Sequence, residues 1–582
     1  MSDLPPREEN PCRPRHFRPD PCAPAPLEGP ARQSLDTSHT RLLITAALFC
    51  LAFLVIAGRL VEVTLLGSAS DLRLARHDAP SHKPLWRGDI TDRNGVLLAT
   101  TLDTPSLFAD PKQVIDAKDA AHRLHQVLPD LDEGELVARL SSDKSFVWLK
   151  RHLTPREEAD VNRLGLPGLQ FQSEGRRVYP EGDLAAHVVG YTDTDNNGLA
   201  GVERGLDKRL KAGEAVRLSL DARVQYILRD ETAKAVAEFN AIGGMGIVMD
   251  VRTGEILALV SLPDFDPNQP STATPETTFD RATLGAYEMG SVFKIFTIAM
   301  ALDDRVATLE SSYDATNPIH IGRFTIHDDH AQRRWLTVPE IFEYSSNIGA
   351  AKIAAEVGAD RQRDFLDRLG LTHAPRFEIK ELADPLVPAV WRPVNTMTIG
   401  FGHGISVSPL QLATAVSAVA NGGVLHSATL VKLPDGAAPA GERVLSTATS
   451  IEMRKLLRLV VEHGTGKLAN ADGYLVGGKT GTAEKVAGRH YERHALLSSF
   501  VGVFPVNDPR YVVLVSVDEP HGNKQTAGYA TGGWIAAPAV RATIERMAPL
   551  VGIPPVDEDS PEIRRSLMVD LPTPQGRKFA AN

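Results

Sequence analysis

The pattern of apolar and polar positions divides the chain into distinct stretches. Residues 1–40 hold many prolines and charged side chains and few apolar ones, so we expect a disordered tail there. An uncharged run from Leu42 to Gly58 follows, bounded by Arg41 and Arg59. Apolar residues continue beyond it, and a helix needs about 20 such residues to cross a bilayer. The pattern therefore predicts a transmembrane helix over 41–62.

Two other interpretations of this run are weaker. A cleaved signal peptide has an apolar core of roughly 7–15 residues behind a short charged start, whereas here the run is longer and follows a long polar tail. A buried helix of a soluble domain would show a polar face, and this run has none. Arginines are slightly more numerous before the run than basic residues are behind it, which places the tail in the cytoplasm.

Residues 63–215 mix short strand and helix patterns. Asn94-Gly95 between apolar alternations is a strong hairpin signal, so we expect two paired strands from Arg87 to about Phe108. Short helices are predicted over 115–170, one of them at the capping box that Thr154 opens. Extended, turn-rich chain follows. The stretch is typical of an elongated α+β module that supports another domain.

A larger domain is predicted over 216–555. A helix over 221–235 precedes apolar runs at 246–250 and 255–261, which bracket a turn and indicate a hairpin inside a sheet. Mostly helical chain is expected from 288 to about 425. Late strands are predicted at 479–483, 498–504 and 511–517, then a helix over 535–547 and a polar C-terminal tail over 556–582.

Composition narrows the functional class. The chain has 582 residues, 43% of them hydrophobic and 23% charged, as expected for a globular protein of several domains. Its net charge of −10 argues against nucleic-acid binding. The cysteines are Cys12, Cys22 and Cys50, so disulfides cannot hold the rest of the chain. The sequence shows neither a metal-ligand cluster nor a phosphate-binding glycine loop, so we expect no cofactor and no metal.

The candidate chemistry centres on Glu288-Met-Gly-Ser-Val-Phe-Lys-Ile-Phe296. In a helix, Ser291 and Lys294 share a face because they are three residues apart. Apolar neighbours indicate that this helix is buried. Burial disfavours the charged form of a lysine and lowers its pKa, so Lys294 can take a proton from Ser291. The spacing therefore predicts a nucleophile with its base.

This pair alone is a weak signal. An N-cap serine and a lysine that reaches water give the same pattern, and Ser141 and Lys144 repeat the spacing among polar residues, where we expect surface. Two further motifs strengthen the prediction. Tyr344-Ser-Ser-Asn347 follows a helix start at 337–340, and Lys479-Thr-Gly-Thr482 enters a strand. Ser-x-x-Lys, Ser-x-Asn and Lys-Thr-Gly in this order form the motif set of penicillin-binding proteins and serine β-lactamases.

The chain resembles class B penicillin-binding proteins, the monofunctional peptidoglycan D,D-transpeptidases. The resemblance covers nearly all of the chain after the tail, and its residues are the three motifs, the segments 87–95, 177–180 and 201–203. The segments 345–347, 400–404 and 408–411 look more like the division-specific (FtsI) branch than the elongation branch. The implied fold is α+β and multidomain: a transmembrane helix at 41–62, a pedestal at 63–215, and a transpeptidase domain at 216–555 with an antiparallel sheet flanked by helices.

The resemblance also implies a role for each motif residue. Ser291 attacks the penultimate D-Ala of a stem peptide, Lys294 takes its proton, Ser345 relays a proton to the leaving amine, and Asn347 holds Lys294 and the substrate amide. Lys479 keeps the site electropositive and lowers the pKa of Lys294 by repulsion. Thr480 and Thr482 bind the terminal carboxylate, and Gly481 leaves room for substrate. The N–H groups of Ser291 and Thr482 form the oxyanion hole.

The implied partners are D-Ala-D-Ala stem peptides, β-lactams as covalent inhibitors, an FtsW-type glycosyltransferase and other division proteins. The implied location is the inner membrane, with the catalytic domain in the periplasm at the division septum. An elongation-type transpeptidase, a D,D-carboxypeptidase or β-lactamase-like hydrolase, and a non-enzymatic β-lactam sensor are the alternatives. Four other features are expected to have no catalytic role: His403 as a loop residue, Glu381 as a solvated side chain, and the segments 465–467 and 531–533 at the rim of the site.

Overall fold

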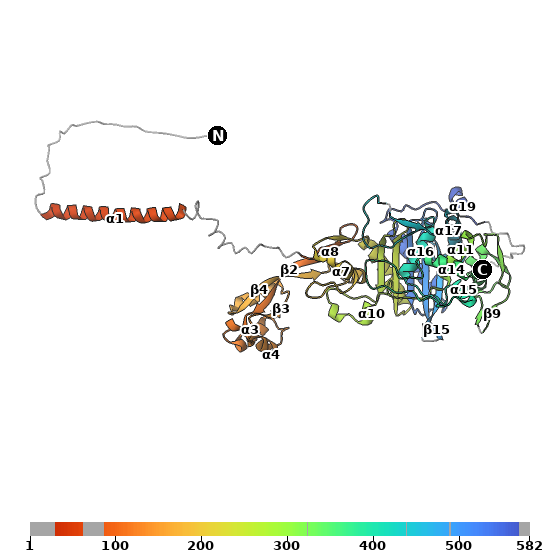
Figure 1. Ribbon diagram of the computed structural model, residues 1–582, viewed down its shortest axis with the longest axis horizontal. Helices are drawn as coiled ribbons and strands as arrows, with labels where there is room; N and C mark the ends of the chain where they lie inside the picture. Colours follow the sequence, from red (N-terminus) through yellow and green to blue (C-terminus); the bar gives the residue numbers. More distant parts are fainter. Residues whose placement is uncertain (1–29, 62–85, 323, 438, 488–489, 570–582) are drawn as a thin grey trace, which may run out of the picture. The chain divides into compact units, whose positions relative to one another are not determined.

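The computed structural model describes residues 30–61, 86–322, 324–437, 439–487 and 490–569 (Figure 1). These residues belong to two units that divide between Pro84 and Leu85. The first unit contributes one helix, α1 (Pro30–Val61), and the second contributes all other elements. Most of the predicted tail, residues 1–29, lies outside the described residues.

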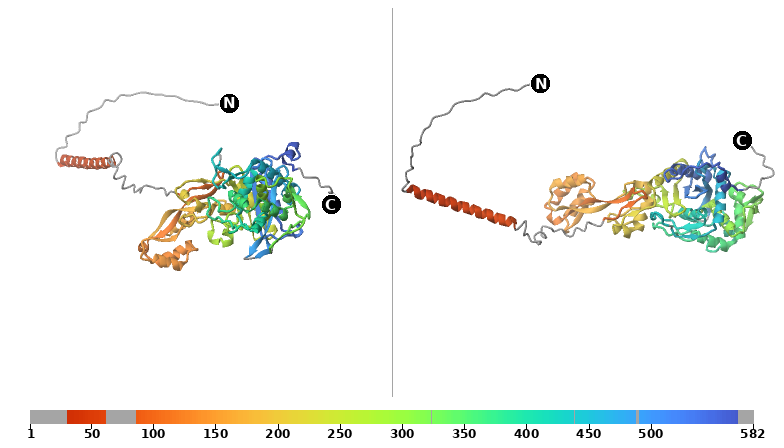
Figure 2. Two further views of the ribbon diagram at one scale, coloured as in Figure 1. Left: turned by 45° about the vertical axis from the view of Figure 1, so that its right-hand side comes forward. Right: turned by 90° about the horizontal axis from the view of Figure 1, so that it is seen from above.

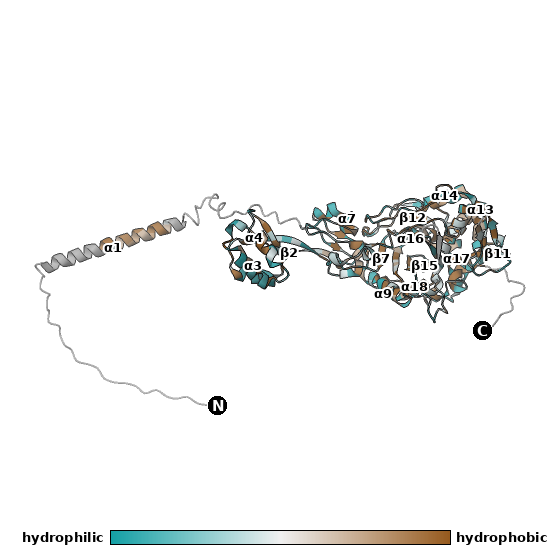
Figure 3. Cartoon of the chain, turned by 90° about the horizontal axis from the view of Figure 1, so that it is seen from below, coloured by the Kyte–Doolittle hydropathy of each residue, from teal (hydrophilic) through white to brown (hydrophobic). Residues whose placement is uncertain are grey.

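Helix α1 is longer than predicted at its N-terminal end. It begins at Pro30, so residues 30–40 are helical in a segment where we expected disorder. Proline is favoured in a first helical turn, and the alanine, arginine, glutamine and leucine behind it are good helix formers. The apolar side chains at 43–58 are exposed, and the cartoon of α1 has brown, hydrophobic residues in Figure 3. Within the described ranges, none of the helices combines the length and the apolar character of a membrane span, so the transmembrane helix stays a prediction.

The pedestal is built on a five-stranded sheet. Its strands are β1 (Ile90–Thr91), β2 (Leu97–Ala109), β3 (Val147–Lys150), β4 (Leu169–Val178) and β5 (Val216–Arg217), in the order β3-β2-β1-β5 with β4 also paired to β2. The predicted hairpin is confirmed, since β1 and β2 pair antiparallel. Asp92 fixes its turn by accepting bonds from the N–H groups of Asn94 and Val96, and Gly95 adopts φ +92°.

Short helices pack against one part of this sheet, as predicted. They are η2 (Pro111–Gln113), α3 (Ala117–Val127), α4 (Glu133–Leu140) and α5 (Pro155–Leu164). The capping box at the start of α5 is present, with reciprocal bonds between Thr154 and Glu157. The apolar faces of these helices meet strand residues in a separate small core, which includes Leu107, Leu124 and Leu149.

A buried charge cluster holds the other part of the pedestal together. The chain here forms η3 (Gly182–Ala185), α6 (Ala186–Val189), α7 (Gly201–Gly205) and α8 (Asp207–Lys211). Glu203 on α7 is 0% exposed and accepts a bond of 2.5 Å from Arg87 and one of 2.6 Å from Arg177. A buried carboxylate is stable only when it is paired. By pairing with both arginines, this glutamate joins three segments that are far apart in sequence.

The transpeptidase-like domain contains an antiparallel sheet in the order β14-β15-β16-β6-β7. The strands are β6 (Gly243–Asp250), β7 (Ile256–Leu262), β14 (Gly477–Ala487), β15 (His490–Phe504) and β16 (Tyr511–Asp518), so the predicted hairpin and late strands are confirmed. Helices α9 (Ala222–Glu238) and α18 (Gly532–Met547) cover one face. Helices α11 (Lys294–Asp303), α16 (Pro409–Ala420) and α17 (Thr447–Glu462) pack against the other (Figures 1 and 2).

The stretch from 288 to 425 is less helical than predicted. It contains helices α12 (Val338–Glu343), α13 (Asn347–Val357), α14 (Ala359–Arg368) and α15 (Pro393–Ile399), but also four short strands. These are β8 (Ser312–Asp314), β9 (Ile319–Ile321), β10 (Phe324–Ile326) and β11 (Trp335–Thr337). They form two-stranded pairs of three residues each, which are too short to give a clear alternation in sequence. Further short elements of the domain are η4 (Pro270–Thr272), α10 (Pro275–Thr278), β12 (Val424–His426), β13 (Gly441–Arg443) and η6 (Lys467–Ala469).

The predicted C-terminal tail is folded over its described part. Residues 556–569 include helix α19 (Pro561–Leu567), which begins at a Ser560 cap. Ile563 and Leu567 pack against the main core, and Glu558 accepts a 2.7 Å bond from Arg458 on α17. A helix of seven residues, of which only Ile563 and Leu567 pack on the core, is too short for its periodicity to stand out from a polar sequence, which explains the error. Residues 570–582 lie outside the described range.

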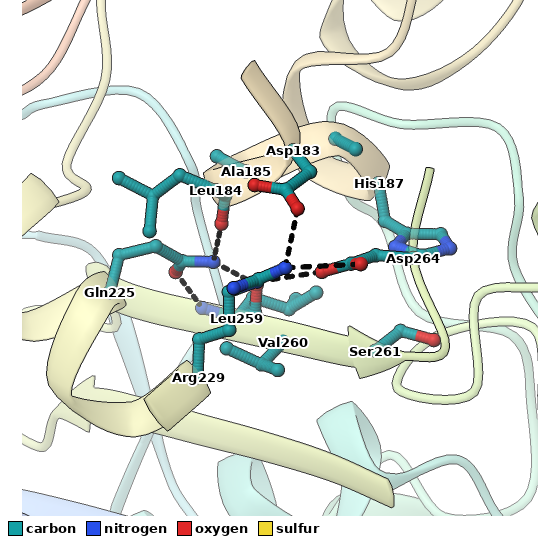
Figure 4. Close-up of a pocket in the computed structure, with 11 residues that line it drawn as sticks. Asp183, Leu184, Ala185, His187, Gln225, Arg229, Leu259, Val260, Ser261 and Asp264 are labelled. Atoms are coloured by element: carbon teal, nitrogen blue, oxygen red, sulfur yellow. Dashed lines mark hydrogen bonds and ion pairs between the residues drawn. The ribbon is translucent and has the colours of Figure 1, made fainter. Parts of the chain in front are cut away.

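A polar pocket marks the joint between pedestal and transpeptidase-like domain (Figure 4). Arg229 on α9 donates bonds of 2.6 Å to Asp183 of η3 and 2.7 Å to Asp264 after β7. Gln225, one turn earlier, bonds to the carbonyls of Leu184 and Leu259. The charge of this arginine is therefore compensated by two carboxylates, and the pocket lining contains none of the predicted site residues.

Candidate functional site

Ser291 and Lys294 lie at a change of helix type. Residues Gly290–Phe293 form a 3-10 turn, η5, and the α-helix α11 begins at Lys294. The sequence predicted a helix here without specifying its type, and the structure shows a 3-10 turn at Ser291 that continues as an α-helix. In a 3-10 turn, residues three apart eclipse each other, so the turn aligns Lys294 with Ser291 more directly than an α-helix would. Gly290 allows this tight entry with φ +54°.

The amine of Lys294 is surrounded by oxygen atoms. Its Nζ lies 2.9 Å from Ser291 Oγ, 3.0 Å from Ser345 Oγ, 2.6 Å from the Ser345 carbonyl oxygen and 2.7 Å from Asn347 Oδ1. The carbonyl and amide oxygens can only accept, so they take the two N–H bonds of a neutral amine. The nitrogen lone pair is then left for a hydroxyl proton, and Ser291 supplies one.

Burial makes this neutral form accessible. Lys294 is 0% exposed, and loss of solvation lowers its pKa to about 7, although the nearby Asp328 and Asp329 act in the opposite direction. Burial is the cause that the sequence predicted. The repulsion that the family resemblance implied acts instead on Lys479, because the charge of Lys294 lowers the pKa of Lys479.

Lys479 completes a short chain of polar groups. Its Nζ lies 3.1 Å from Ser345 Oγ, so the Ser345 hydroxyl stands between the two amines. Lys479 is also 0% exposed and lies 5.8 Å from the centre of the Phe342 ring. Burial, and to a smaller extent the charge of Lys294, lowers the pKa of Lys479 well below its usual value. A proton can therefore pass between these amines through one hydroxyl.

A strained turn presents Ser345. The residue joins α12 to α13 and has φ +58°, a left-handed conformation that is unusual for a serine. Asp328 stabilises the turn by accepting bonds of 2.8 Å from Ser346 Oγ and 2.9 Å from the Ile348 N–H. Asn347 in turn donates to the His327 carbonyl at 3.1 Å. The strain is thus maintained by a buried carboxylate.

Strand β14 passes directly over the start of η5. A Cβ at Gly481 would stand 2.6 Å from the Met289 carbonyl oxygen, and one at Gly290 would stand 2.5 Å from that of Thr482. Only glycines permit this approach. The approach brings the backbone of Thr482 beside the turn that carries Ser291. The N–H groups of these two residues are the ones expected to bind an oxyanion.

Two threonines of β14 are fixed by their neighbours. Thr482 Oγ1 accepts a 3.1 Å bond from the Gly532 N–H at the start of α18. Thr480 Oγ1 lies 2.7 Å from Thr465 Oγ1 and 3.4 Å from Lys479 Nζ. All eight predicted site residues, Ser291, Lys294, Ser345, Asn347, Lys479, Thr480, Gly481 and Thr482, therefore gather around one place at the edge of β14.

Other residues that the sequence analysis considered lie in the pedestal or at its joint with the transpeptidase-like domain. Ser141 and Lys144 are exposed at the end of α4 in the pedestal. Glu381 is not the solvated side chain that we expected, because it accepts bonds from the Gly201 N–H and from Arg204 at the joint with the pedestal. A loop glutamate that binds another domain has the same local sequence as a free one.

His403 borders the site. Its segment runs beside η5, since the Gly290 N–H donates to the Gly402 carbonyl at 3.3 Å. Its Nδ1 lies 3.9 Å from Glu288 Oε2, and Glu288 Oε1 accepts a 2.8 Å bond from the Gly404 N–H. Burial and the charge of Lys294 lower the pKa of His403 to about 4. The ring is therefore neutral near pH 7.

Sequence reasoning missed Asp328, Glu288 and Thr465. Asp328 lies in His327-Asp-Asp-His330, a cluster of ionisable residues that was the available signal. Thr465 was placed at the rim, but nothing in its sequence neighbourhood indicated a bond to Thr480. Among the described residues, no group of three or more histidine, cysteine, aspartate or glutamate side chains is arranged to hold a metal ion.

Comparisons with known proteins agree with this geometry. Residues 244–545 match the family described as penicillin binding protein transpeptidase domain, and residues 83–234 match the penicillin-binding protein dimerisation domain. The chain is 44% identical over 482 residues to the probable peptidoglycan D,D-transpeptidase FtsI of Caulobacter vibrioides, covering 80% of this chain and 82% of the relative. It is 30% identical to the peptidoglycan D,D-transpeptidase FtsI of Escherichia coli K12, covering 88% and 92%.

A solved structure has a similar fold over most of this chain. Penicillin-binding protein 3 of Mycobacterium tuberculosis, crystallised with aztreonam, superposes with a TM-score of 0.65 at 25% identity, covering 81% of this chain and 98% of the other. The family match spans more than half of the chain, and the curated relatives match over most of their length. The chain therefore belongs to the class B penicillin-binding proteins, the family of peptidoglycan D,D-transpeptidases.

Proposed function

We propose that this protein cross-links stem peptides of septal peptidoglycan through an acyl-enzyme on Ser291. The observation that carries the proposal is the 2.9 Å contact between Lys294 Nζ and Ser291 Oγ, made by a buried amine whose pKa is about 7. Near neutral pH a large share of such an amine is unprotonated, so it can act as a base toward an alcohol.

Acylation follows from the contacts around that amine. Lys294 takes the hydroxyl proton while Ser291 Oγ bonds to the carbonyl carbon of the penultimate D-Ala. The N–H groups of Ser291 and Thr482 stabilise the negative oxygen of the tetrahedral intermediate, a contribution that is typically worth about 10²–10³ in rate. The C–N bond then breaks, and Ser345 passes a proton to the departing D-Ala amine, which leaves an ester on Ser291.

The bonding of Ser345 suits this second proton transfer. Its Oγ lies between Lys294 Nζ and Lys479 Nζ, at 3.0 and 3.1 Å, so a proton it gives away is replaced from a neighbouring amine. The amine of a second stem peptide then attacks the ester. It loses its proton through the same groups, the C–O bond breaks, and Ser291 recovers its hydroxyl as the cross-link forms.

The substrate carboxylate belongs beside Thr480 and Thr482. Lys479 lies close to Thr480, and burial and the charge of Lys294 lower its pKa. A bound carboxylate would raise that pKa, because an opposite charge favours the ammonium form. Substrate binding therefore directs a proton to Lys479 and leaves Lys294 neutral, which is the charge state that acylation needs.

Location and partners are part of the same proposal. Helix α1 exposes apolar side chains over 43–58, and we assign it as the anchor in the inner membrane, with the N-terminus in the cytoplasm and the catalytic domain in the periplasm. β-Lactams acylate the same serine, consistent with the aztreonam complex of the mycobacterial relative. An FtsW-type glycosyltransferase and other division proteins are the proposed macromolecular partners.

A cross-linking assay tests this function. The purified full-length protein is incubated with glycan strands that carry stem peptides ending in D-Ala-D-Ala, and both free D-alanine and cross-linked dimers are measured by mass spectrometry. We expect both products with the wild type and neither with Ser291→Ala. Release of D-alanine without dimers would identify a carboxypeptidase, and stable β-lactam labelling with neither product would identify a sensor. Side-wall rather than mid-cell localisation would assign the elongation branch.

A further inference from the structure

The bond between Thr465 and Thr480 has a chemical consequence beyond packing. The two Oγ1 atoms are 2.7 Å apart, although the residues are on different elements. Thr465 lies in the loop between α17 and η6, and Thr480 lies on β14. A hydroxyl has one proton to donate and two lone pairs to accept with. One of the two protons is used between the threonines, so the pair keeps a single proton for anything else.

The loop that carries Thr465 is held tightly. The N–H groups of Gly464 and Gly466 both donate to the Val460 carbonyl at 3.1 Å, which folds the loop over the end of α17. A Cβ at Gly464 would stand 2.8 Å from the Glu343 carbonyl oxygen, and one at Gly533 would stand 2.5 Å from the Thr465 carbonyl oxygen. Close backbone neighbours on two sides therefore fix the position of the hydroxyl.

We propose that Thr465 is a positioning residue that orients the Thr480 hydroxyl toward the substrate's terminal carboxylate. This rests on the proposed function, in which the anion lies beside Thr480 and Thr482. A carboxylate only accepts hydrogen bonds. When it is bound, Thr480 donates to it, so Thr480 must accept from Thr465. Thr482 is arranged in the same way, since its oxygen accepts from the Gly532 N–H and its proton is free to face the ligand.

The sharpest test compares two ligands that differ only in charge. One is a thioester of an N-acyl-D-alanine with a mercapto acid as the leaving group, whose carboxylate is free, and the other is the same compound with a carboxamide in place of that carboxylate. The second-order acylation rate constant is measured for both with wild type, Thr465→Val and Thr465→Ser, and the individual KM and kcat are resolved. A net hydrogen bond is worth roughly a threefold to tenfold change in an equilibrium constant.

We expect Thr465→Val to reduce the rate constant for the carboxylate ligand about threefold to tenfold, mainly through KM, with little change for the carboxamide. Thr465→Ser should restore the wild-type preference, because it keeps the hydroxyl. Equal losses for both ligands, or no loss for either, would overturn the proposal. If Thr465→Val does not fold, Thr465→Ala serves in its place.

A matched control and a check on the proposed function complete the design. Thr543→Val removes a buried threonine hydroxyl on α18 that bonds to the Ala539 carbonyl at 2.8 Å, and it should leave the ligand preference unchanged. A wild-type protein that is not acylated by either ligand would refute the proposed function itself. Acylation of the wild type without a change of preference in Thr465→Val would refute only the role of Thr465.

Discussion

Ser345 Oγ lies 3.1 Å from Lys479 Nζ and so connects the second and third sequence motifs directly. The same oxygen is 3.0 Å from Lys294 Nζ, which connects it to the first. Three segments that are far apart in the chain thus share one hydroxyl. Its position depends on a backbone conformation, φ +58°, that a serine adopts only when its surroundings enforce it.

Replacing Ser345 by glycine should remove the hydroxyl and leave the backbone of the turn unchanged. Glycine adopts positive φ without strain, so Ser345→Gly should keep the backbone and the thermal stability. Loss of the proton relay should lower the acylation rate by about 10²–10³, within the usual range for a general acid. Stopped-flow measurement with a chromogenic cephalosporin checks this. A rate within a few-fold of the wild type would show that Ser345 does not relay the proton.

The pH dependence of acylation should report Lys294. Only the neutral amine accepts a proton, and burial lowers its pKa to about 7, so the rate should rise with pH through a midpoint near that value and level off above it. A histidine would ordinarily titrate in the same range. The pKa of His403 is lowered to about 4, however, so His403→Gln should keep the midpoint in place. A midpoint that disappears in this variant would assign the titration to the histidine.

Removal of the Asp328 charge should change both stability and pH dependence. Asp328→Asn keeps one acceptor oxygen and replaces the other by a donor, so it can accept from only one of Ser346 Oγ and the Ile348 N–H. We therefore expect the free energy of unfolding to fall by about 1–3 kcal/mol. Asp328 also raises the pKa of Lys294, so the midpoint of the acylation profile should move to lower pH. Denaturant unfolding and the rate profile measure the two effects.

Asp329→Asn is the matched control for that variant. Asp329 is exposed and also raises the pKa of Lys294, so its removal should move the midpoint in the same direction and leave the bonds of Asp328 intact. If both variants destabilise the protein equally, Asp328 is not the anchor of the turn.

Gly402 should be intolerant of any side chain. It has φ +88°, and a Cβ there would stand 2.0 Å from the carbonyl oxygen of Gly290, next to Ser291. Gly402→Ala should therefore displace η5 and reduce both stability and acylation. Gly370 has a similar φ of +73° but open space around its Cβ position, so Gly370→Ala isolates the cost of the backbone conformation, of order 1–3 kcal/mol. Equal effects of the two substitutions would contradict a steric role for Gly402.

Local patterns predicted the elements that depend on local interactions. The hairpin at Asn94-Gly95, the capping boxes at Thr154 and Thr337 and the sheet strands all carry their signals within a few residues. The 3-10 turn at Ser291 could not be predicted this way, because it depends on the contact between Gly290 and β14. The paired strands at 312–337 and helix α19 are too short for a clear period.

The same difference between local signals and distant contacts applies to the site. Motif order predicted which residues meet, and burial of an apolar helix predicted a lowered pKa for Lys294. The support of the site was not predictable, because Asp328 and Thr465 act through bonds to residues 15 to 20 positions away in the chain. Their sequence neighbourhoods do not contain the residues that they bind.

The most direct test of the account is the identity of the acylated residue. The protein is incubated with benzylpenicillin, and intact mass and peptide mapping by mass spectrometry locate the adduct. We expect one equivalent of drug on Ser291, its loss in Ser291→Ala, and an unchanged adduct in Ser141→Ala, which alters the exposed pedestal serine with the same spacing to a lysine. A covalent adduct that persists in Ser291→Ala would contradict the central claim that Ser291, activated by Lys294, is the nucleophile.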